Sequence, residues 1–314
     1  MGRNVLVTGG GGFVGAWVLR ELLARGLSPI LLDLQDNTHR WSRVLGSTTE
    51  NFTYVRGDLA DRQGLRRVFD EHEITHVIHL GALLTPACQQ DPWLGCQVNV
   101  LGSVTVFDQV RAAGSRIQGM SYASSLGVYG PQPDDRSFAA QADEIHSPTF
   151  YGVYKRAVEQ IAQQYWQHFN IRSVGICPYV AYGPERDQGL TAAPSLAARA
   201  AARGERFTIS YTGAARYDYV EDVARAFVQT ALSTPAGAHV VEFPSEIATP
   251  KDIVLAIDSV VPGAAKNLVV EGPPLPFNVP PRRALISTIV DEWKTTSLTE
   301  GMRRTIDFYR SRSD

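Results

Sequence analysis

The chain has 314 residues, of which 44% are hydrophobic and 20% are charged, and its formal net charge is −2. These values are typical of a soluble globular protein that buries a substantial core in one large or two unequal domains. Because the chain carries no excess of basic residues, we expect neither nucleic acid nor an anionic membrane as a partner.

The chain begins with a short apolar strand, followed by a glycine-rich turn and an amphipathic helix. In this turn Gly9 permits a tight bend, Gly12 lets the backbone approach a pyrophosphate, and Gly15 lets the helix pack close to the strand. The phosphates would rest on the N–H groups of the first helical residues, Phe13 and Val14. The spacing G-x-x-G-x-x-G differs from that of the commonest dehydrogenases, and a flexible turn is the alternative.

Asp33 closes the second apolar strand. A carboxylate at this place accepts hydrogen bonds from the adenosine ribose hydroxyls and repels a 2′-phosphate. The sequence therefore predicts NAD as the cofactor rather than NADP, although Arg40 and Arg43 follow closely enough to reach a 2′-phosphate. The alternative role of Asp33 is to cap a helix or turn. Asp58 ends the third strand, where its side chain would lie near the adenine.

Strand-like and helix-like segments alternate through about residue 177. Short, fully apolar strands between helices predict a parallel sheet that is covered on both faces, with the ligand at the carboxyl ends of the strands. We therefore predict an α/β fold with a Rossmann-type, doubly wound parallel sheet over residues 1–178, which would bind NAD and carry the catalytic residues. Residues 179–314 would form a smaller C-terminal substrate-binding cap, with some segments returning to the main sheet. Strands are expected at residues 5–7, 30–32, 52–55, 77–80, 117–123, 173–177 and 239–243. Helices are expected at residues 13–25, 63–71, 98–112, 151–169, 195–203, 221–232, 251–261 and 299–309.

The three cysteines, Cys88, Cys96 and Cys177, have no spacing that is typical of a metal site. Such a scattered, odd set suits a reducing compartment. The N-terminus shows no signal sequence, and no apolar stretch reaches the roughly 20 residues that span a bilayer, so we predict a cytoplasmic protein without a metal ion. His76 and His79 bracket the fourth strand and are expected to pack in the core.

Tyr151 and Lys155 begin a long predicted helix and, being four residues apart, lie on one face of it. A lysine ammonium beside a phenol lowers the pKa of the phenol, so Tyr151 is the candidate acid and base and Lys155 its partner. Ser125, after the fifth strand, would orient a substrate hydroxyl toward Tyr151, with Ser124 as the alternative. Without a catalytic role, either serine would cap a turn. Asn99 would link the backbone of the fourth strand to Lys155 through water, unless it is a buried polar group that is satisfied locally.

Taken in order, these motifs resemble those of the extended short-chain dehydrogenase/reductase family, also called the NAD-dependent epimerase/dehydratase family. The resemblance covers nearly the whole chain and rests on residues 8–15, 33, 57–59, 76–82, 99–102, 124–130, 151–155, 182–184 and 298–309. It implies hydride transfer to and from NAD, with Tyr151 as acid and base, Lys155 as its pKa partner and Ser125 as the positioning hydroxyl. It also implies cofactor contacts, which include Asp58, Leu59, Leu80, Ala82 and Asn99.

The stretch after the sixth strand departs from the sugar-nucleotide branch of this family. Those relatives usually carry R-P-x-N-V-x-G-P, whereas this chain has Cys177 in place of the Arg and Val180 in place of the Asn, which commonly binds the substrate diphosphate. The later R-D-Y-I-H-V-x-D motif, at residues 216–222, is one residue short and lacks the His. The loss of such charge-assisted partners weakens diphosphate binding by a few kcal/mol and argues against a nucleotide-sugar.

Residues 80–85, by contrast, resemble the corresponding stretch of short-chain L-threonine dehydrogenases, and four-carbon sugar-acid dehydrogenases are similar in outline. Those relatives oxidise a secondary alcohol on a small substrate that bears a carboxylate. Arg216 is then the first candidate for an anion anchor and Arg186 the second, unless both are solvated surface side chains. Thr85 would add a hydroxyl, and Tyr179 is a further candidate for a substrate contact.

The leading hypothesis is an NAD-dependent dehydrogenase that acts on a secondary alcohol or ketone of a small sugar, sugar acid or hydroxy acid. The alternative is a nucleotide-sugar epimerase or dehydratase, such as a UDP-sugar 4-epimerase, that uses tightly bound NAD. A dinucleotide-binding sensor or scaffold is the third hypothesis, and the intact catalytic set argues against it.

We also expect a homodimer formed by the helices at residues 98–112 and 151–169, unless the apolar stripe that includes Val158 and Ala162 faces the sheet instead.

Overall fold

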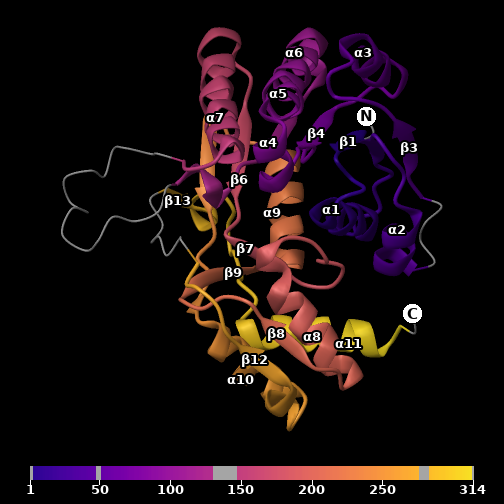
Figure 1. Ribbon diagram of the computed structural model, residues 1–314. Coiled ribbons are helices and arrows are strands. Elements are labelled where there is room, and N and C mark those ends of the chain that lie inside the picture. Colours follow the sequence, from indigo (N-terminus) through magenta and orange to yellow (C-terminus); the bar gives the residue numbers. More distant parts are fainter. Residues whose placement is uncertain (1–2, 47–50, 130–146, 276–282, 313–314) are drawn as a thin grey trace.

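Eight parallel strands form the main sheet of the computed structural model, which describes residues 3–46, 51–129, 147–275 and 283–312 (Figure 1). The strand order is β13-β10-β6-β5-β4-β1-β2-β3, so it reverses beside β1, which pairs with β2 on one side and β4 on the other. In such a sheet ligands bind at this switch point, beyond the carboxyl ends of the strands. The predicted Rossmann-type fold is confirmed. Its strands are β1 (Val5–Thr8), β2 (Ile30–Asp33), β3 (Thr53–Arg56), β4 (His76–His79), β5 (Gly119–Ala123), β6 (Ser173–Cys177), β10 (Ala238–Glu242) and β13 (Ala284–Leu285).

Helices cover both faces of the main sheet, because successive side chains of a strand point to opposite faces. Val5 and Val7 of β1 pack with α1 and α9 on one face, whereas Leu6 packs with α3, α6 and α7 on the other. The helices of this part are α1 (Phe13–Ala24), α2 (Thr38–Leu45), α3 (Arg62–Glu71), α4 (Thr85–Gln90), α5 (Pro92–Cys96), α6 (Gly102–Ala113), α7 (Phe150–Phe169) and α9 (Val220–Leu232).

A smaller cap lies beside the carboxyl ends of the strands (Figure 1). It holds a three-stranded sheet in the order β11-β9-β7 and the parallel pair β12-β8. The chain does not divide once into two parts, because α9, β10 and β13 leave the cap and join the main sheet. The cap elements are β7 (Val180–Tyr182), α8 (Ala193–Arg203), β8 (Phe207–Ile209), β9 (Ala215–Tyr219), β11 (Ile247–Ala248), α10 (Pro250–Val260), β12 (Leu268–Val270) and α11 (Leu298–Arg310).

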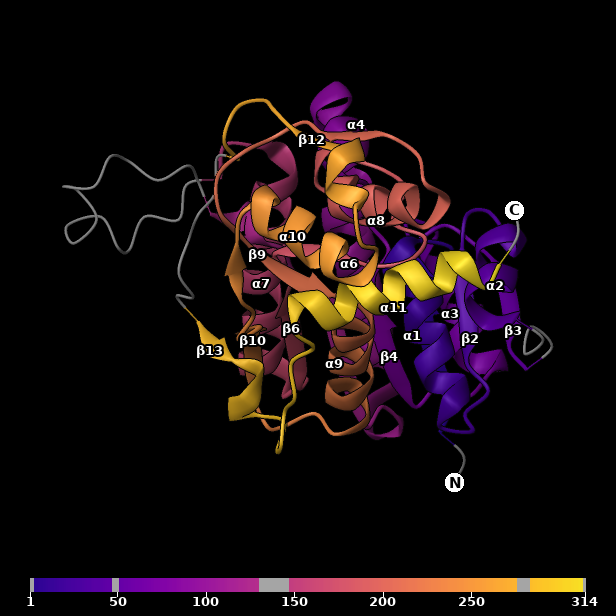
Figure 2. The ribbon, with the colours of Figure 1, turned by 90° about the horizontal axis from the view of Figure 1, so that it is seen from below.

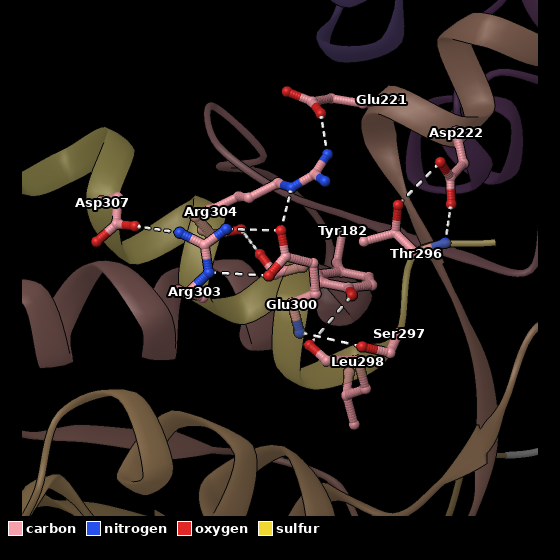
Figure 3. A network of polar contacts seen from close by, with 12 residues as sticks. Tyr182, Glu221, Asp222, Thr296, Ser297, Leu298, Glu300, Arg303, Arg304 and Asp307 are labelled. Atoms are coloured by element: carbon pink, nitrogen blue, oxygen red, sulfur yellow. Dashed lines mark hydrogen bonds and ion pairs between the residues drawn. The ribbon is translucent and has the colours of Figure 1, made fainter. Parts of the chain in front are cut away.

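Helix α11 crosses the molecule from the side of β10 toward α2 (Figure 2). Its polar contacts fasten it to the first turn of α9 (Figure 3). Arg304 donates to Glu221 at 2.8 Å and to Glu300 at 2.7 Å, and Asp222 accepts the backbone N–H of Thr296 at 2.6 Å. The cap is thereby joined to a helix that packs on the main sheet.

Some elements differ from the sequence predictions. The helix expected at residues 98–112 is interrupted, because a π-helical turn occupies Gln97–Leu101 and α6 begins only at Gly102. Helix α2 and the short cap strands were not predicted. Among the described residues no helix is long and apolar enough to cross a membrane, and no three His, Cys, Asp or Glu side chains gather as a metal site.

His76 and His79 are buried in the core, as predicted, with 1% and 4% of their surfaces exposed. The ring of His79 forms hydrogen bonds with the hydroxyl of Thr8, 2.7 Å from Nδ1, and with the hydroxyl of Ser103, 2.9 Å from Nε2. Burial lowers the pKa of His79 to about 3, so the ring is neutral and links β1 and β4 to α6.

Candidate active site

The turn after β1 and the first turn of α1 each contain a position that only glycine can occupy. Gly9 has a φ of +72°, and a Cβ atom there would lie 2.6 Å from the Cα atom of Gly81. A Cβ atom on Gly15 would lie 2.5 Å from the carbonyl oxygen of Gly9. Gly12 precedes α1 and offers no side chain to cap it, so the first N–H groups of the helix can bind an anion.

A cavity of about 450 Å³ lies beside this turn, at the switch point of the main sheet. Its lining shows that residues predicted from separate motifs are brought together. The predicted lining residues are Gly9, Gly12, Phe13, Val14, Asp33, Asp58, Leu59, Leu80, Ala82 and Arg186, the last of which was predicted for substrate. Leu83, Leu84 and Val98 also line the cavity and were not predicted. Their positions in the sequence, directly after the β4 motif for Leu83 and Leu84 and next to Asn99 for Val98, were the one indication that they could line a cofactor site. The glycine turn, the open helix terminus and the Asp33 carboxylate together fit a dinucleotide.

Asp33 lies at the end of β2 and also holds the glycine turn. Its carboxylate accepts the backbone N–H of Gly11 at 2.9 Å and that of Leu34 at 2.8 Å. Arg40 donates to the carbonyl oxygen of Gly11 and forms an ion pair with Asp187, while Arg43 forms an ion pair with Glu185. Because both arginines already have acidic partners, this arrangement favours a cofactor that has no 2′-phosphate.

We expect the protein to bind NAD about ten-fold or more tightly than NADP, because the Asp33 carboxylate repels a 2′-phosphate. Asp33→Asn keeps an oxygen that can accept the N–H of Gly11 but removes the charge, so the ratio of the two dissociation constants is expected to fall toward one. Titration calorimetry with both dinucleotides measures this ratio. Equal affinities in the unaltered protein would contradict the assignment of Asp33.

Tyr151 and Lys155 lie on the first two turns of α7, which Thr149 caps by accepting the N–H of Gly152 at 3.1 Å. The ammonium of Lys155 lies 5.7 Å from the centre of the Tyr151 ring and donates to the carbonyl oxygen of Ala123 at 2.8 Å. The hydroxyl of Ser125 accepts the N–H of Gly127 at 3.1 Å and is close enough to Tyr151 to lower the pKa of its phenol. The predicted acid and base, its lysine and one serine therefore form a single cluster at the end of β5.

The charge on this cluster is governed first by burial. Burial raises the pKa of Tyr151, while the hydrogen bond with Ser125 and the positive charge of Arg186 lower it. Burial also lowers the pKa of Lys155 to about 8, against the opposing influence of Cys88 and Glu159. The sequence led us to expect that Lys155 lowers the pKa of Tyr151, but burial is the largest influence on that pKa, and the influences that lower it come from Ser125 and Arg186.

The neighbouring polar candidates are held by other partners. Ser124 donates its hydroxyl to Glu159 of α7. Asn99, in the π-helical turn, accepts the backbone N–H of Leu83 at 2.7 Å and donates to its carbonyl oxygen at 2.9 Å. Asn99 therefore fixes the loop that lines the cavity, and a water link to Lys155 stays a prediction.

The candidate substrate residues lie in three places. Thr85 begins α4, and Arg186 lies at the cavity, with its guanidinium carbon 5.4 Å from the Phe13 ring. Arg216 of β9 lies 5.7 Å from the Tyr179 ring and donates to the carbonyl oxygen of Ser245 at 3.0 Å. Within the described part of the chain, the Nε atoms of Arg186 and Arg216 are buried and have no hydrogen-bond partner.

Sequence reasoning missed three charged groups near the site, namely the buried Glu159 and Asp218 and the partly exposed Arg283. Asp218 accepts the backbone N–H of Tyr179 at 2.6 Å, and burial raises the pKa of Asp218 to about 6. Glu159 is 1% exposed and pairs with Arg283. The spacing of Glu159, eight residues after Tyr151, was the one signal in the sequence, since it puts both on one helical face.

Comparison with known proteins agrees with this geometry. Residues 5–241 match the NAD dependent epimerase/dehydratase family. The UDP-glucose 4-epimerase of Neisseria meningitidis serogroup C is 29% identical over 312 residues, which cover 90% of this chain and 86% of that protein. The UDP-glucose 4-epimerase of Erwinia amylovora is 36% identical over 166 residues, which cover 52% of this chain but only about half, 48%, of that relative.

Among solved structures, the UDP-glucose 4-epimerase of Thermus thermophilus in complex with NAD has a TM-score of 0.75 and 27% identity, and the match covers 99% of this chain and 100% of that one. The UDP-glucose 4-epimerase of Thermotoga maritima shares the fold, with a TM-score of 0.79 at 22% identity and coverage of 98% and 99%. None of these matches supports the resemblance to L-threonine and sugar-acid dehydrogenases.

Proposed function

Since the chain belongs to the NAD dependent epimerase/dehydratase family, we propose that it is an NAD-dependent epimerase whose substrate is a nucleotide-sugar. One observation carries the proposal: Tyr151, Ser125 and Lys155 cluster in a fold that has a dinucleotide cavity and is shared with a UDP-glucose 4-epimerase. The relatives do not support the leading hypothesis of a small-substrate dehydrogenase, so its alternative takes its place.

The three residues of the cluster divide the chemistry among them. When bound, NAD supplies the acceptor and donor of hydride. Tyr151 accepts the proton of a sugar hydroxyl as its carbon is oxidised, and Ser125 holds that hydroxyl in place. Lys155 stabilises the phenolate of Tyr151 with its positive charge. The keto-sugar then rotates in the site and presents its other face. When hydride returns to that face and Tyr151 returns the proton, the carbon has the opposite configuration.

The diphosphate of such a substrate needs cationic partners other than those of the usual motif. Cys177 and Val180 are fully buried and uncharged, so they cannot replace the Arg and Asn of related chains. Arg216 and Arg186 each have a buried Nε atom that can still donate a hydrogen bond. We propose that Arg216, beside Tyr179, is the first of the two to bind the diphosphate.

Purified protein is expected to retain NAD and to interconvert UDP-glucose and UDP-galactose without net formation of NADH. Mass spectrometry of the small molecules released on denaturation measures the retained cofactor, and chromatography of the sugar nucleotides measures the conversion. Protein that is free of cofactor and reduces added NAD with a small hydroxy acid or sugar acid would overturn the proposal in favour of a dehydrogenase.

We propose a homodimer as the assembled form. The stripe of Val158 and Ala162 faces the sheet, where both side chains are buried, so it cannot form the interface. Instead, Trp93 of α5 and Val153 of α7 are 75% and 50% exposed. Tyr154 joins the two helices, because its hydroxyl donates to the carbonyl oxygen of Pro92 at 2.8 Å.

A cytoplasmic location stays a prediction from the cysteine content.

Trp93→Glu is expected to convert the dimer into a monomer, because a charge would be buried in the apolar interface. Light scattering is expected to give about twice the chain mass of 34.4 kDa for the unaltered protein and the single mass for the variant. Leu255→Glu is the matched control, since Leu255 is 65% exposed on α10 of the cap. A monomeric mass for the unaltered protein would remove the proposed interface.

A further inference from the structure

The loop at residues 183–187, which follows β7, is held by contacts with α1 and α11. The carbonyl oxygen of Pro184 accepts the indole N–H of Trp17 at 3.0 Å. The backbone N–H of Glu185 donates to the hydroxyl of Tyr309 at 2.8 Å. Glu185 has a φ of +68°, which is uncommon for a residue other than glycine and persists only where the surroundings hold it. The end of this loop is therefore kept in a defined position.

Asp187, at the end of the loop, contacts Arg40 of α2, which is 147 residues away in the sequence. Arg186, the residue before it, lines the cofactor cavity. Both carboxylate oxygens of Asp187 accept from Nη2 of Arg40, at 3.1 and 3.0 Å. Nη1 of the same guanidinium donates to the carbonyl oxygen of Gly11 at 2.8 Å. The side chain of Arg40 is 13% exposed and that of Asp187 is 46% exposed. A nearly buried cation is thus shared between the glycine turn and the loop.

Gly11 also contacts Asp33, the residue assigned to the adenosine ribose. The N–H of Gly11 donates to the carboxylate of Asp33 at 2.9 Å, while its carbonyl oxygen accepts from Arg40. Arg40 and Asp33 are therefore joined through one residue, so Arg40 is a cation within reach of a 2′-phosphate on that ribose. A guanidinium can bind a phosphate through two hydrogen bonds, but here it is already paired with a carboxylate.

We propose that Asp187 is a second determinant of the choice between NAD and NADP. Asp33 repels a 2′-phosphate directly, whereas Asp187 neutralises Arg40 and thereby withholds the cation that would bind this phosphate. The two acidic residues come from distant parts of the chain, the end of β2 and the loop after β7, and act on one position of the cofactor. The proposal concerns the cofactor alone and does not depend on the identity of the sugar substrate.

Titration calorimetry with NAD and NADP tests the role of Asp187 through the ratio of the two dissociation constants. Asp33→Asn alone is expected to bring this ratio toward one. Asp33→Asn with Asp187→Asn is expected to bind NADP about five-fold more tightly than NAD, because no carboxylate then competes with the 2′-phosphate for Arg40. The asparagine at position 187 keeps an oxygen that can accept from Arg40, so the loop retains a bond to α2. A double variant with the ratio of Asp33→Asn alone would overturn the proposal.

Two further variants separate Arg40 from a general effect of charge. Asp307→Asn, added to Asp33→Asn, is the matched control, because Asp307 is 50% exposed and pairs with Arg303 of α11 at 2.9 Å. It changes the net charge equally and is expected to leave the ratio within about two-fold. Arg40→Met, added to the double variant, is expected to return the ratio to that of Asp33→Asn alone.

The ratio is the appropriate measure, because the loss of the bond from Arg40 to Gly11 weakens the binding of both dinucleotides. Asp36 also lines the cavity and is present in every variant, so its repulsion is common to all of them. A preference for NADP that survives without Arg40, or that Asp307→Asn reproduces, would overturn the role of Asp187. Since binding is measured without substrate, the result stands whether or not the protein proves to be an epimerase.

Discussion

Tyr151→Phe is expected to lower kcat about 10³-fold, because in the proposed mechanism the phenol oxygen takes the proton of the reacting hydroxyl. The phenyl ring would still pack against Gly127, because a Cβ atom built on Gly127 would lie only 3.3 Å from Cδ1 of the Tyr151 ring. The loss of activity is therefore expected to come from the missing hydroxyl and not from a change in packing. The affinity for NAD is expected to stay within about two-fold, since only one hydroxyl is lost. Stopped assays of epimerisation and calorimetric titration with NAD measure the two quantities.

Tyr154→Phe is the matched control for this variant. Tyr154 lies on the same helix, but its hydroxyl donates to the carbonyl oxygen of Pro92, away from the cluster. Its removal is expected to cost about 1 kcal/mol of stability and to leave kcat nearly unchanged. A Tyr151→Phe enzyme that retains more than about a tenth of the activity would show that another group is the acid and base.

Gly9→Ala is expected to weaken NAD binding about 100-fold or more, which corresponds to about 2.7 kcal/mol. A Cβ atom at this position lies 2.6 Å from both the Cα and the N atoms of Gly81, so the loop after β4 must move. That loop carries Ala82 and Leu83, which line the cavity. Calorimetric or fluorescence titration with NAD measures the change.

Gly26→Ala separates the clash from backbone strain. Gly26 has a φ of +71°, close to the +72° of Gly9, but a Cβ atom there meets no atom within 4 Å. The strain is expected to cost this control about 1 kcal/mol of stability without altering NAD affinity. If both variants bound NAD equally well, the close approach of the two loops would have no part in binding the cofactor.

The elements that could be predicted from the sequence are those with a simple pattern of apolar residues. β1 and β2 are continuous apolar runs because both faces of the sheet are covered, and Gly9 and Gly15 mark the turn after β1 and the start of α1. β7 has three residues between Pro178 and Pro184, too few to show a pattern. β9 includes Arg216 and the buried Asp218, whose polar partners lie elsewhere in the chain.

The same limit applies to the site. Local spacing was enough to place Tyr151 and Lys155 on one face of α7, and the sequence favoured Ser125 but left Ser124 as an alternative. What distinguishes the two serines in the structure is Glu159, which accepts the hydroxyl of Ser124, whereas Ser125 acts on Tyr151. Arg283 could not be predicted, because its partner Glu159 is 124 residues away in the sequence.

The late arrival of β10 in the main sheet has a consequence for biosynthesis. β6 finds its outer neighbour only in β10, which pairs with it over five residues from Ala238↔Ser173 to Glu242↔Cys177. A nascent chain that has left the ribosome only as far as residue 178 therefore presents β6 as an apolar, unpaired edge, which is a template for aggregation. A fragment of residues 1–178, expressed alone to obtain the cofactor-binding part, would keep the edge of β6 unpaired permanently and is therefore expected to aggregate.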